Sequence, residues 1–432
     1  PKSWGISDDL GQIEYIFSDK TGTLTQNVME FKKCAIADKS YGLAYTSAQE
    51  GYDKRLGNVD VTAKAKYMKE LIANSRSQMI PQLKSSNPFF KEENLAFVSP
   101  EFMDEMNDKR NHDFLLALAL CHSAVIDYED MNSANDETII NYSAESPDEI
   151  ALVSFARDMG VVFLGKEDDY YLVSDNGKQL KYKVLCVIPF SSARKRMRIV
   201  LESPDGNIKM YMKGADNVIM QRSARGEFDE EIGKNLEEYS NEGLRTLCIS
   251  TKDLNPNEFY DWYDHYAKAG KLLDEQRELE TERLADQFEN SVVLLGATAI
   301  DDKLQDGVPE TIESLRKAGI KIWVLTGDKV ETAISIGYSC SMLNNNMDLL
   351  KVQSESVEDL ERTIDALLKE KFDIDPTKAV NLKQARSDHS IPDERHALLI
   401  DGKTLTILFD ESPKDVQLKF LMLGKKCCSI LC

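Results

Sequence analysis

The chain of 432 residues is longer than a single hydrophobic core usually supports, so we expect at least two domains. Its 42% hydrophobic and 29% charged residues are typical of a globular protein and exclude a disordered or fibrous one. The 74 acidic and 53 basic residues give a net charge of −21, which repels phosphate backbones and excludes nucleic acid as a partner.

The longest apolar stretches, at 114–121 and 292–300, are shorter than the roughly 18 residues that a membrane-spanning helix needs. We therefore expect no transmembrane segment. The residues after Pro1 show no targeting leader, so nothing in them directs export or import. We expect the chain to be a piece of a longer protein. The eight cysteines form no CxxC pair and lie at no zinc-finger spacing from a histidine. Reduced cytosolic thiols are the expectation.

The first predicted element is a buried strand over 13–17, which ends at Ser18 and Asp19 and runs into a loop that contains Gly22. A second unit of this kind follows much later, with a helix, a helix stop, a strand and another helix at 308–318, Gly319, 320–325 and 329–338. Its strand runs into Thr326, Gly327 and Asp328. Such repeats build a parallel α/β sheet, whose ligands collect at the carboxyl ends of the strands.

Roughly 300 residues separate Asp19 from Asp328, far more than a crossover connection needs, so a whole domain must be inserted between the two loops. This interval alternates polar segments with strand-like runs and ends in one or two charged helices, at 48–64, 127–141, 181–188, 208–212 and 258–290. After the second loop we expect a strand at 396–401, a helix at 414–423 and a final strand from 427. We interpret 34–295 as an inserted α+β domain, and 1–33 and 296–432 as the two parts of the parallel α/β domain.

The loop after the first strand has residues suited to phosphoryl transfer. A carboxylate at a strand end, followed by small polar residues and glycine, is well placed as a nucleophile whose incoming phosphate is held by backbone N–H groups. This residue is Asp19. Lys20 can neutralise a γ-phosphate, and Thr21 can offer oxygen ligands to phosphate or Mg²⁺.

The two loop sequences resemble motifs of a known family. SDKTGTLT at 18–25 resembles the signature of P-type ATPases, and LTGD at 325–328 resembles their second phosphate-binding motif. Soluble haloacid-dehalogenase-type phosphatases have a second aspartate where this chain has Thr21, so an aspartyl phosphate at Asp19 should persist. Taken alone, Asp19 fits a turn and Asp328 a helix N-cap, and capping by Asp328 is compatible with phosphate binding.

Further segments resemble the type IV P-type ATPases, the phospholipid flippases, and in particular those of fungi. These segments are SPDE at 146–149, PFSSARKRM at 189–197, MKGAD at 212–216, EGLRTL at 242–247 and DKLQDGVPETI at 302–312. The resemblance implies a haloacid-dehalogenase-like doubly wound parallel sheet as the phosphorylation domain, incomplete at its C-terminus. It also implies that the inserted α+β domain binds the nucleotide.

The resemblance implies ATP as substrate and Mg²⁺ as cofactor, and it assigns residues to both. Phe190 would stack on adenine, and the rest of the nucleotide would be surrounded by Glu149, Ser192, Lys195, Lys213 and Arg245. The transferred phosphate would meet Asp19, Lys20, Thr21, Thr326, Gly327 and Asp328, and Asp19 and Thr21 would be the metal ligands.

Several of these residues have plainer interpretations. For Phe190 alone, burial in a core is the commoner role of phenylalanine. Lys213 fits a surface strand end, Arg245 a helix cap and Glu149 the first turn of a helix. The basic cluster at 194–198 could be a localisation signal or a membrane-binding patch, but beside Phe190 we interpret it as an ATP-facing wall.

The expected function of the full-length protein is ATP-driven phospholipid translocation through an aspartyl phosphate at Asp19. Its expected partners are a membrane and an accessory membrane β-subunit, at the cytosolic face of the plasma membrane, Golgi or endosome. The sequence ends before the family's GDGxND motif, so we expect this segment to bind ATP without turnover and to expose an unpaired strand edge. The alternatives are a truncated non-catalytic nucleotide-binding module and a soluble haloacid-dehalogenase-type phosphatase, which Thr21 and the large insert disfavour.

Overall fold

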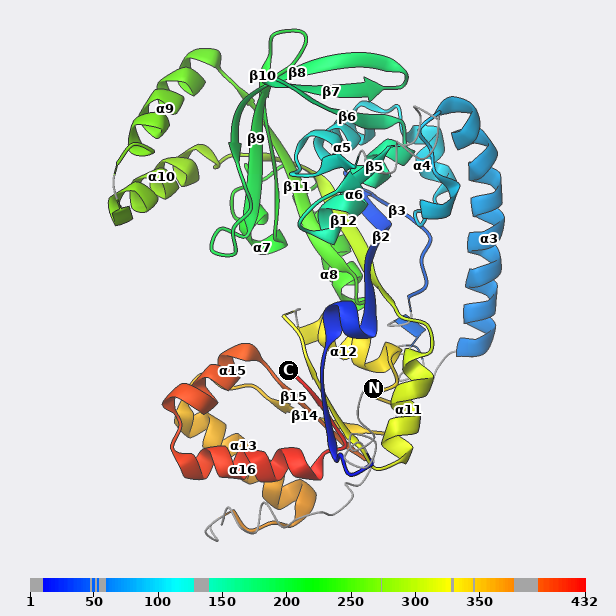
Figure 1. The fold of residues 1–432 in the computed structure, drawn as a ribbon, viewed down its shortest axis with the longest axis vertical. Coiled ribbons are helices and arrows are strands. Elements are labelled where there is room, and N and C mark those ends of the chain that lie inside the picture. Colours follow the sequence, from blue (N-terminus) through cyan, green and yellow to red (C-terminus); the bar gives the residue numbers. More distant parts are fainter. Residues whose placement is uncertain are drawn as a thin grey trace, which may run out of the picture.

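The computed structural model describes residues 11–46, 49–50, 53, 60–127, 140–272, 274–327, 330–344, 346–376 and 395–432. These residues form two lobes, each built on its own sheet, that follow one another along the long axis of the molecule (Figure 1). One lobe contains a five-stranded parallel sheet and the other a nine-stranded antiparallel sheet. The predicted fold class, a parallel α/β sheet with a large mixed α+β insert, is confirmed.

The parallel lobe is a doubly wound sheet. Its strand order is β1-β13-β16-β15-β14, with strands at Tyr15–Asp19, Lys321–Leu325, Ser429–Leu431, His396–Ile400 and Asp348–Val352. Helices α11 and α12 cover one face and α13 and α16 the other, at Val308–Lys317, Val330–Ser339, Val357–Phe372 and Lys414–Lys426. Two short helices, α15 and η4, precede α16 at Gly402–Thr406 and Ile407–Glu411. Because successive side chains of a strand point to opposite faces, Leu398 and Leu399 of β15 enter two different cores.

Most predicted elements of this lobe are confirmed within a few residues. The strand predicted over 13–17 is β1 at Tyr15–Asp19, because Ser18 and Asp19 still pair with Val324 and Leu325 of β13. The predicted helices at 308–318 and 414–423 are α11 and α16. The last strand, β16, lies between β13 and β15 in the middle of the sheet.

The antiparallel lobe has the strand order β3-β2-β12-β11-β10-β9-β8-β7-β6. The ranges in that order are Lys39–Tyr41, Thr25–Ile36, Val293–Leu304, Arg245–Leu254, Ile208–Gly214, Arg196–Glu202, Lys178–Ile188, Tyr170–Asp175 and Val161–Glu167. Helices α4, α5 and α6 cover one face of this sheet, at Pro100–Glu105, Lys109–Leu120 and Pro147–Asp158. Helices α7, α8, α9 and α10 lie on the other, at Asp216–Met220, Asp229–Asn241, Pro256–Ala269 and Asp274–Phe288. A small hairpin, β4 and β5, is formed by Val125–Asp127 and Asn141–Ser143.

One long helix was missed in the sequence. Helix α3 spans Val61–Ser86 and runs along the side of the antiparallel lobe, and the 3-10 turn η2 (Glu92–Asn94) follows it (Figure 1). The segment predicted as polar over 48–64 therefore ends inside this helix. Its N-cap is Asp60, whose carboxylate accepts a hydrogen bond from the Ala63 N–H. Only one narrow stripe of this helix is buried, including Met79 and Leu83, so the sequence carries little amphipathic signal. Residues 128–139 of the second polar segment lie outside the described residues.

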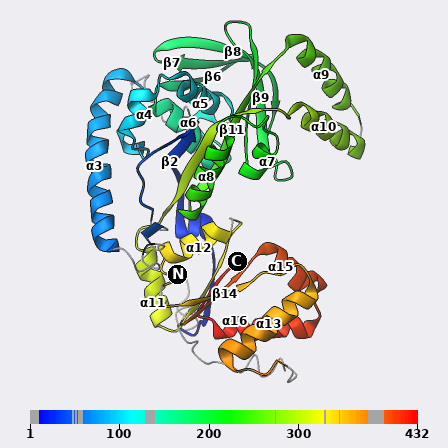
Figure 2. The ribbon, with the colours of Figure 1, turned by 180° about the vertical axis from the view of Figure 1, so that it is seen from behind.

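A two-stranded ribbon joins the two lobes. Strands β2 and β12 pair antiparallel from Ala35 with Ala297 down to Thr25 with Leu304, next to the parallel sheet. Figure 2 shows the same ribbon from behind, running from the nine-stranded sheet towards α12. The domain boundaries that we predicted, after 33 and after 295, fall within these two strands.

Strand β1 forms one edge of the parallel sheet and pairs with β13 within the described ranges. Apolar side chains are exposed here, since Phe17 of β1 is 63% exposed and Ile13, just before the strand, is 40% exposed. In the part of the chain that the structure covers, no helix has both the length and the apolar character needed to cross a bilayer.

Candidate functional site

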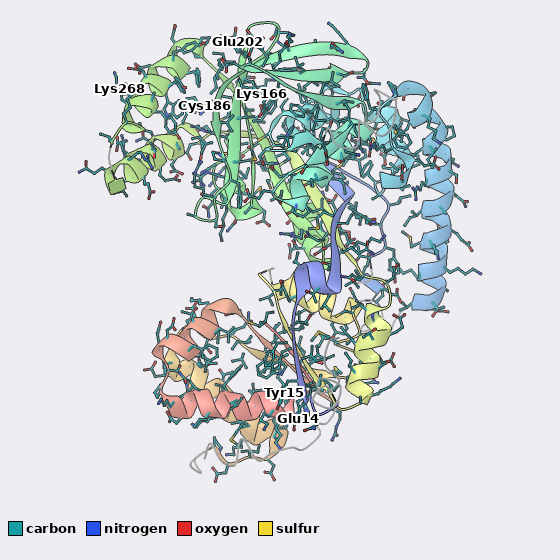
Figure 3. All side chains as sticks on the ribbon, viewed as in Figure 1. Glu14, Tyr15, Lys166, Cys186, Glu202 and Lys268 are labelled. Atoms are coloured by element: carbon teal, nitrogen blue, oxygen red, sulfur yellow. The ribbon has the colours of Figure 1, made fainter. Side chains whose placement is uncertain are left out.

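Asp19 lies at the carboxyl end of β1, opposite Leu325 of β13, and is exposed. Figure 3 shows Tyr15 at the end of β1 that is remote from the antiparallel lobe, so the strand runs towards that lobe and ends at Asp19. The loops that follow β1 and β13 thus leave the same edge of the sheet. Ligands of open α/β sheets bind at this edge.

The loop after Asp19, Lys20–Leu24 (η1), contains a tight turn. Thr21 has φ −76° and ψ 123°, and Gly22 has φ 76° and ψ −3°, which are the dihedral angles of a type II turn. The third residue of such a turn needs a positive φ, which glycine adopts without strain. Open space surrounds the position of a Cβ on Gly22, since the nearest atom is 4.0 Å away, so backbone conformation rather than packing requires glycine.

Two residues outside the predicted site hold this loop in place. The buried Thr25 accepts a hydrogen bond at Oγ1 from the Gly22 N–H at 3.1 Å, and its hydroxyl donates to the Lys20 carbonyl at 3.4 Å. Gln305, just after β12, donates from Nε2 to the carbonyl oxygens of Thr23 and Thr25 at 3.0 and 3.2 Å. The loop is therefore fastened to the ribbon that joins the lobes. No local pattern pairs Gln305 with a loop roughly 280 residues earlier.

Lys20 does not face solvent in this structure. Its ammonium lies 3.1 Å from the carboxylate of Asp302 in β12, and the side chains are only 1% and 3% exposed. The sequence predicts that Lys20 neutralises a γ-phosphate at Asp19. This role would require the buried ion pair to open.

The second loop begins with Thr326 and Gly327, next to Asp19 in the sheet. The Thr326 N–H donates to the Cys432 carbonyl at 2.7 Å, which fixes the backbone where β13 ends. A Cβ added to Gly327 would meet no heavy atom of the described residues within 4 Å, so this side of the loop is open among them. Asp328 lies outside the described residues.

Glu149 and Lys213, predicted from two separate motifs, meet in the antiparallel lobe. Glu149 is in the first turn of α6 and Lys213 near the end of β10, and their charged groups are 2.5 Å apart in a largely buried pair. The other carboxylate oxygen of Glu149 accepts hydrogen bonds from the backbone N–H of Ser123 at 2.7 Å and from its hydroxyl. Burial raises the pKa of Glu149, but Lys213 and the Ser123 donors outweigh it and hold the pKa below its ordinary value. Ser123 was not predicted.

Arg245, at the start of β11, donates from Nη1 to the carboxylate of Asp148 at 3.0 Å. It is not a helix cap. Asp148 is the neighbour of Glu149 in the same helix turn, so the SPDE and EGLRTL motifs are in direct contact. The predicted residues Glu149, Lys213 and Arg245 are thereby brought to one region of this lobe.

The loop between β8 and β9 carries the other predicted nucleotide residues. Phe190 is 59% exposed, which contradicts the alternative of a buried core phenylalanine, and Ser192 and Lys195 are also exposed. Lys195 has a φ of 52°, and its carbonyl accepts a hydrogen bond from the Ala215 N–H at 3.0 Å. A Cβ on Gly214 would lie 2.6 Å from the Lys195 carbonyl oxygen, so glycine is required for this close approach.

Strand register places these residues at one edge of the nine-stranded sheet. Gly214, the last residue of β10, pairs with Arg196 at the start of β9 and with Cys248 near the start of β11. In antiparallel strands, the start of one lies beside the end of the next. The β8–β9 loop, Lys213 and Arg245 are therefore neighbours, although they are up to 55 residues apart in sequence.

The interpretation of the basic cluster as an ATP-facing wall is wrong for three of its four members. Arg194, Arg196 and Arg198 are buried and surround the carboxylate of Glu289, which is itself fully buried. Arg196 and Arg198 alternate along β9 and so point to the face on which α9 and α10 lie, and Arg194, in the turn before β9, reaches the same carboxylate. Lys195 alone points the other way and is exposed.

The described residues contain no group of three or more His, Cys, Asp and Glu side chains that could hold a metal ion. Asp19 and Thr21, on either side of the buried Lys20, are both exposed. This small oxygen set fits Mg²⁺ that arrives with a nucleotide, because Mg²⁺ in such sites keeps waters and binds one or two carboxylates together with phosphate oxygens.

The sheet edges, their loops and the comparison with known proteins define the class. A family model of the P-type ATPase cytoplasmic domain N matches residues 111–307, which is most of the antiparallel lobe. We therefore assign the matched residues to the P-type ATPase family.

Its relatives lie among the lipid-transporting members of that family. The chain is 46% identical to the phospholipid-transporting ATPase DNF1 of Chaetomium thermophilum and 44% identical to DNF2 of Saccharomyces cerevisiae, over 100% of this chain and 28% of each relative. It is 34% identical to phospholipid-transporting ATPase 6 of Arabidopsis thaliana, over 99% of this chain and 36% of the relative. The chain thus spans about a third or less of the length of these relatives.

Proposed function

We propose that this chain is the ATP-using cytosolic part of a phospholipid-transporting pump, in which Asp19 accepts the γ-phosphoryl group of ATP. The observation that carries the proposal is an exposed carboxylate at the carboxyl edge of a parallel sheet, followed by the SDKTGTLT turn, in a chain of this family. Relatives named as phospholipid-transporting ATPases support the lipid as the transported substrate.

In the proposed reaction, a carboxylate oxygen of Asp19 attacks the γ-phosphorus of ATP. A new P–O bond forms at Asp19 as the bond between the γ-phosphorus and the bridging oxygen breaks, and ADP leaves with that electron pair. Mg²⁺, when bound through Asp19 and Thr21, would neutralise phosphate charge. Lys20 would add a positive charge once released from Asp302, and Thr326, Gly327 and Asp328 would bind the phosphate.

The nucleotide would bind at the edge of the antiparallel sheet. Phe190 offers an exposed aromatic face for stacking on adenine. Polar groups around the nucleotide would be supplied by Glu149, Ser192, Lys195, Lys213 and Arg245. With Thr21 where a general base would stand, the aspartyl phosphate would persist long enough to drive lipid movement, in a membrane complex with an accessory β-subunit.

The test is phosphoenzyme formation in the full-length protein with ATP labelled in the γ-phosphate. Asp19→Asn should abolish acid-stable label, because an amide oxygen is not the nucleophile that the reaction needs. The matched control is Asp38→Asn, an exposed aspartate in the turn between β2 and β3, which should leave labelling unchanged. Label that persists in Asp19→Asn would place the acceptor at another residue and disprove the assignment, whereas a wild type that binds ATP without any label would favour a module that only binds nucleotide.

A further inference from the structure

Glu289 is a fully buried carboxylate that follows α10 directly, and three guanidinium groups converge on it. One of its oxygens contacts Nη2 of Arg194 and lies 3.3 Å from Nε of Arg198. The other oxygen accepts a hydrogen bond from Nε of Arg196 at 2.6 Å. Glu289 is the fully buried carboxylate shared by all three cations, in the protein interior, where unpaired charges are costly.

Two of these arginines, Arg194 and Arg196, are the buried side chains of the β8–β9 loop and its junction with β9. The exposed side chains of this loop include Phe190, Ser192 and Lys195. Arg194 lies within the loop, and Arg196 starts β9 and donates from Nη1 to the Arg194 carbonyl at 3.0 Å. Side chain and backbone of the loop are thus both fastened to Glu289. This anchorage lies on the side opposite to the exposed residues.

The loop needs such an anchor because its backbone is not in a relaxed conformation. Lys195 has a φ of 52° although it is not glycine, a conformation that persists where the surroundings enforce it. One constraint comes from the Ala215 N–H, which donates to the Lys195 carbonyl. The second comes from the flanking Arg194 and Arg196 through Glu289.

The α9–α10 hairpin holds Glu289 and its arginine partners in place. Arg198 lies 4.5 Å from the ring centre of Trp262 in α9 and 5.2 Å from that of Phe288 in α10, and these two rings stack at 4.3 Å. Towards solvent, Asp286 contacts Arg196 at 3.1 Å. The hairpin projects sideways from the antiparallel lobe and lies clear of the parallel lobe (Figure 3). The same figure labels Lys268 on its helix α9.

We propose that Glu289 is a positioning residue for nucleotide binding, which holds the β8–β9 loop from behind so that Phe190, Ser192 and Lys195 face the nucleotide. This inference rests on the proposed function. The affinity for nucleotide would then depend on the α9–α10 hairpin, which positions Glu289. Glu289 itself touches no substrate.

The test measures the ATP dependence of lipid-stimulated ATPase activity in the full-length protein. Glu289→Gln keeps the shape of the side chain but removes the charge that orders the three arginines, so the KM for ATP should rise about tenfold, with kcat within about twofold. The control is Glu280→Gln in α10, which removes only an exposed pair with Arg283 and should leave both constants unchanged. An unchanged KM in Glu289→Gln would overturn the inference.

A double-mutant cycle separates positioning from general support of the lobe. If Glu289 acts through the loop, the KM of Phe190→Ala combined with Glu289→Gln should be clearly lower than the product of the two single effects predicts, because part of the effect of Glu289 acts through Phe190. Multiplied effects in the double variant would show independent action and overturn the inference. An unchanged KM in Phe190→Ala alone would instead overturn the proposed nucleotide site, and the inference with it.

If Glu289→Gln does not fold, Arg194→Lys provides the second variant. It keeps a positive charge in the loop but loses the two-sided guanidinium contact to Glu282 and Glu289. The KM for ATP should rise several-fold with kcat nearly unchanged. A KM equal to that of the wild type would overturn the inference.

Discussion

Acidification should lower the free energy of local opening around α5, because this region contains one buried histidine, His122. Its side chain packs edge-on against Phe163, with ring centres 4.6 Å apart, and Nε2 donates to the Ala119 carbonyl at 2.9 Å. Nδ1 has no hydrogen-bond partner among the described residues. Burial, reinforced by the charge of Lys213, lowers the pKa of His122 from 6.5 to about 4.

The sign follows from proton binding in the two states. The opened state binds a proton at His122 below pH 6.5, whereas the folded state does so only below about pH 4, so opening becomes easier as the pH falls between these values. At pH 5.5 these two pKa values give a loss of about 1.4 kcal/mol relative to pH 7.5. This corresponds to a tenfold loss of protection against hydrogen exchange.

The measurement is hydrogen exchange of the α5 amides in the full-length protein at pH 7.5 and 5.5, corrected for the intrinsic rates. Asp158 works in the opposite direction, because burial raises its pKa to about 6 and the folded state takes up that proton first. The variant His122→Gln is the control, because it lacks the imidazole but keeps the contribution of Asp158. The difference between wild type and variant therefore reports His122 alone. Equal losses of protection in wild type and His122→Gln would refute the reasoning.

Two glycine substitutions test the loops at the two sheet edges. Gly22→Ala should destabilise the phosphoryl-acceptor loop by about 1 kcal/mol, because an alanine at φ 76° is strained although space is available, and the rate of phosphoenzyme formation should fall. Gly214→Ala should cost about 1–3 kcal/mol and raise the KM for ATP, because its Cβ would press on the Lys195 carbonyl at 2.6 Å. Wild-type melting temperatures and kinetics in either variant would contradict the corresponding argument.

The parallel lobe could be predicted well because its signals are local. Buried strands that end in small polar residues, followed by helices with a glycine stop, predicted β1, β13 and α11 and placed Asp19 and Thr326 at neighbouring strand ends. Helix α3 was missed because its buried stripe is too narrow to produce a clear period.

The partners of charged residues could not be predicted in the same way. Alternation along β9 places Arg196 and Arg198 on one face, but the burial of that face depends on Glu289, roughly 90 residues later. Lys20 is a similar case. Its residue type suits phosphate, yet the structure pairs it with an aspartate about 280 residues away.

The ribbon between the lobes brings the two sets of predicted residues closer than the sequence suggests. Ile300 of β12 pairs with Arg245, and Asp302, two positions further on, holds Lys20 in the phosphoryl-acceptor loop. Two residues of a strand span about 7 Å. A displacement of β12 caused by a nucleotide contact at Arg245 would therefore reach the Lys20–Asp302 pair directly. In the proposed function, three consecutive residues of one strand would thereby couple arrival of the nucleotide to release of Lys20.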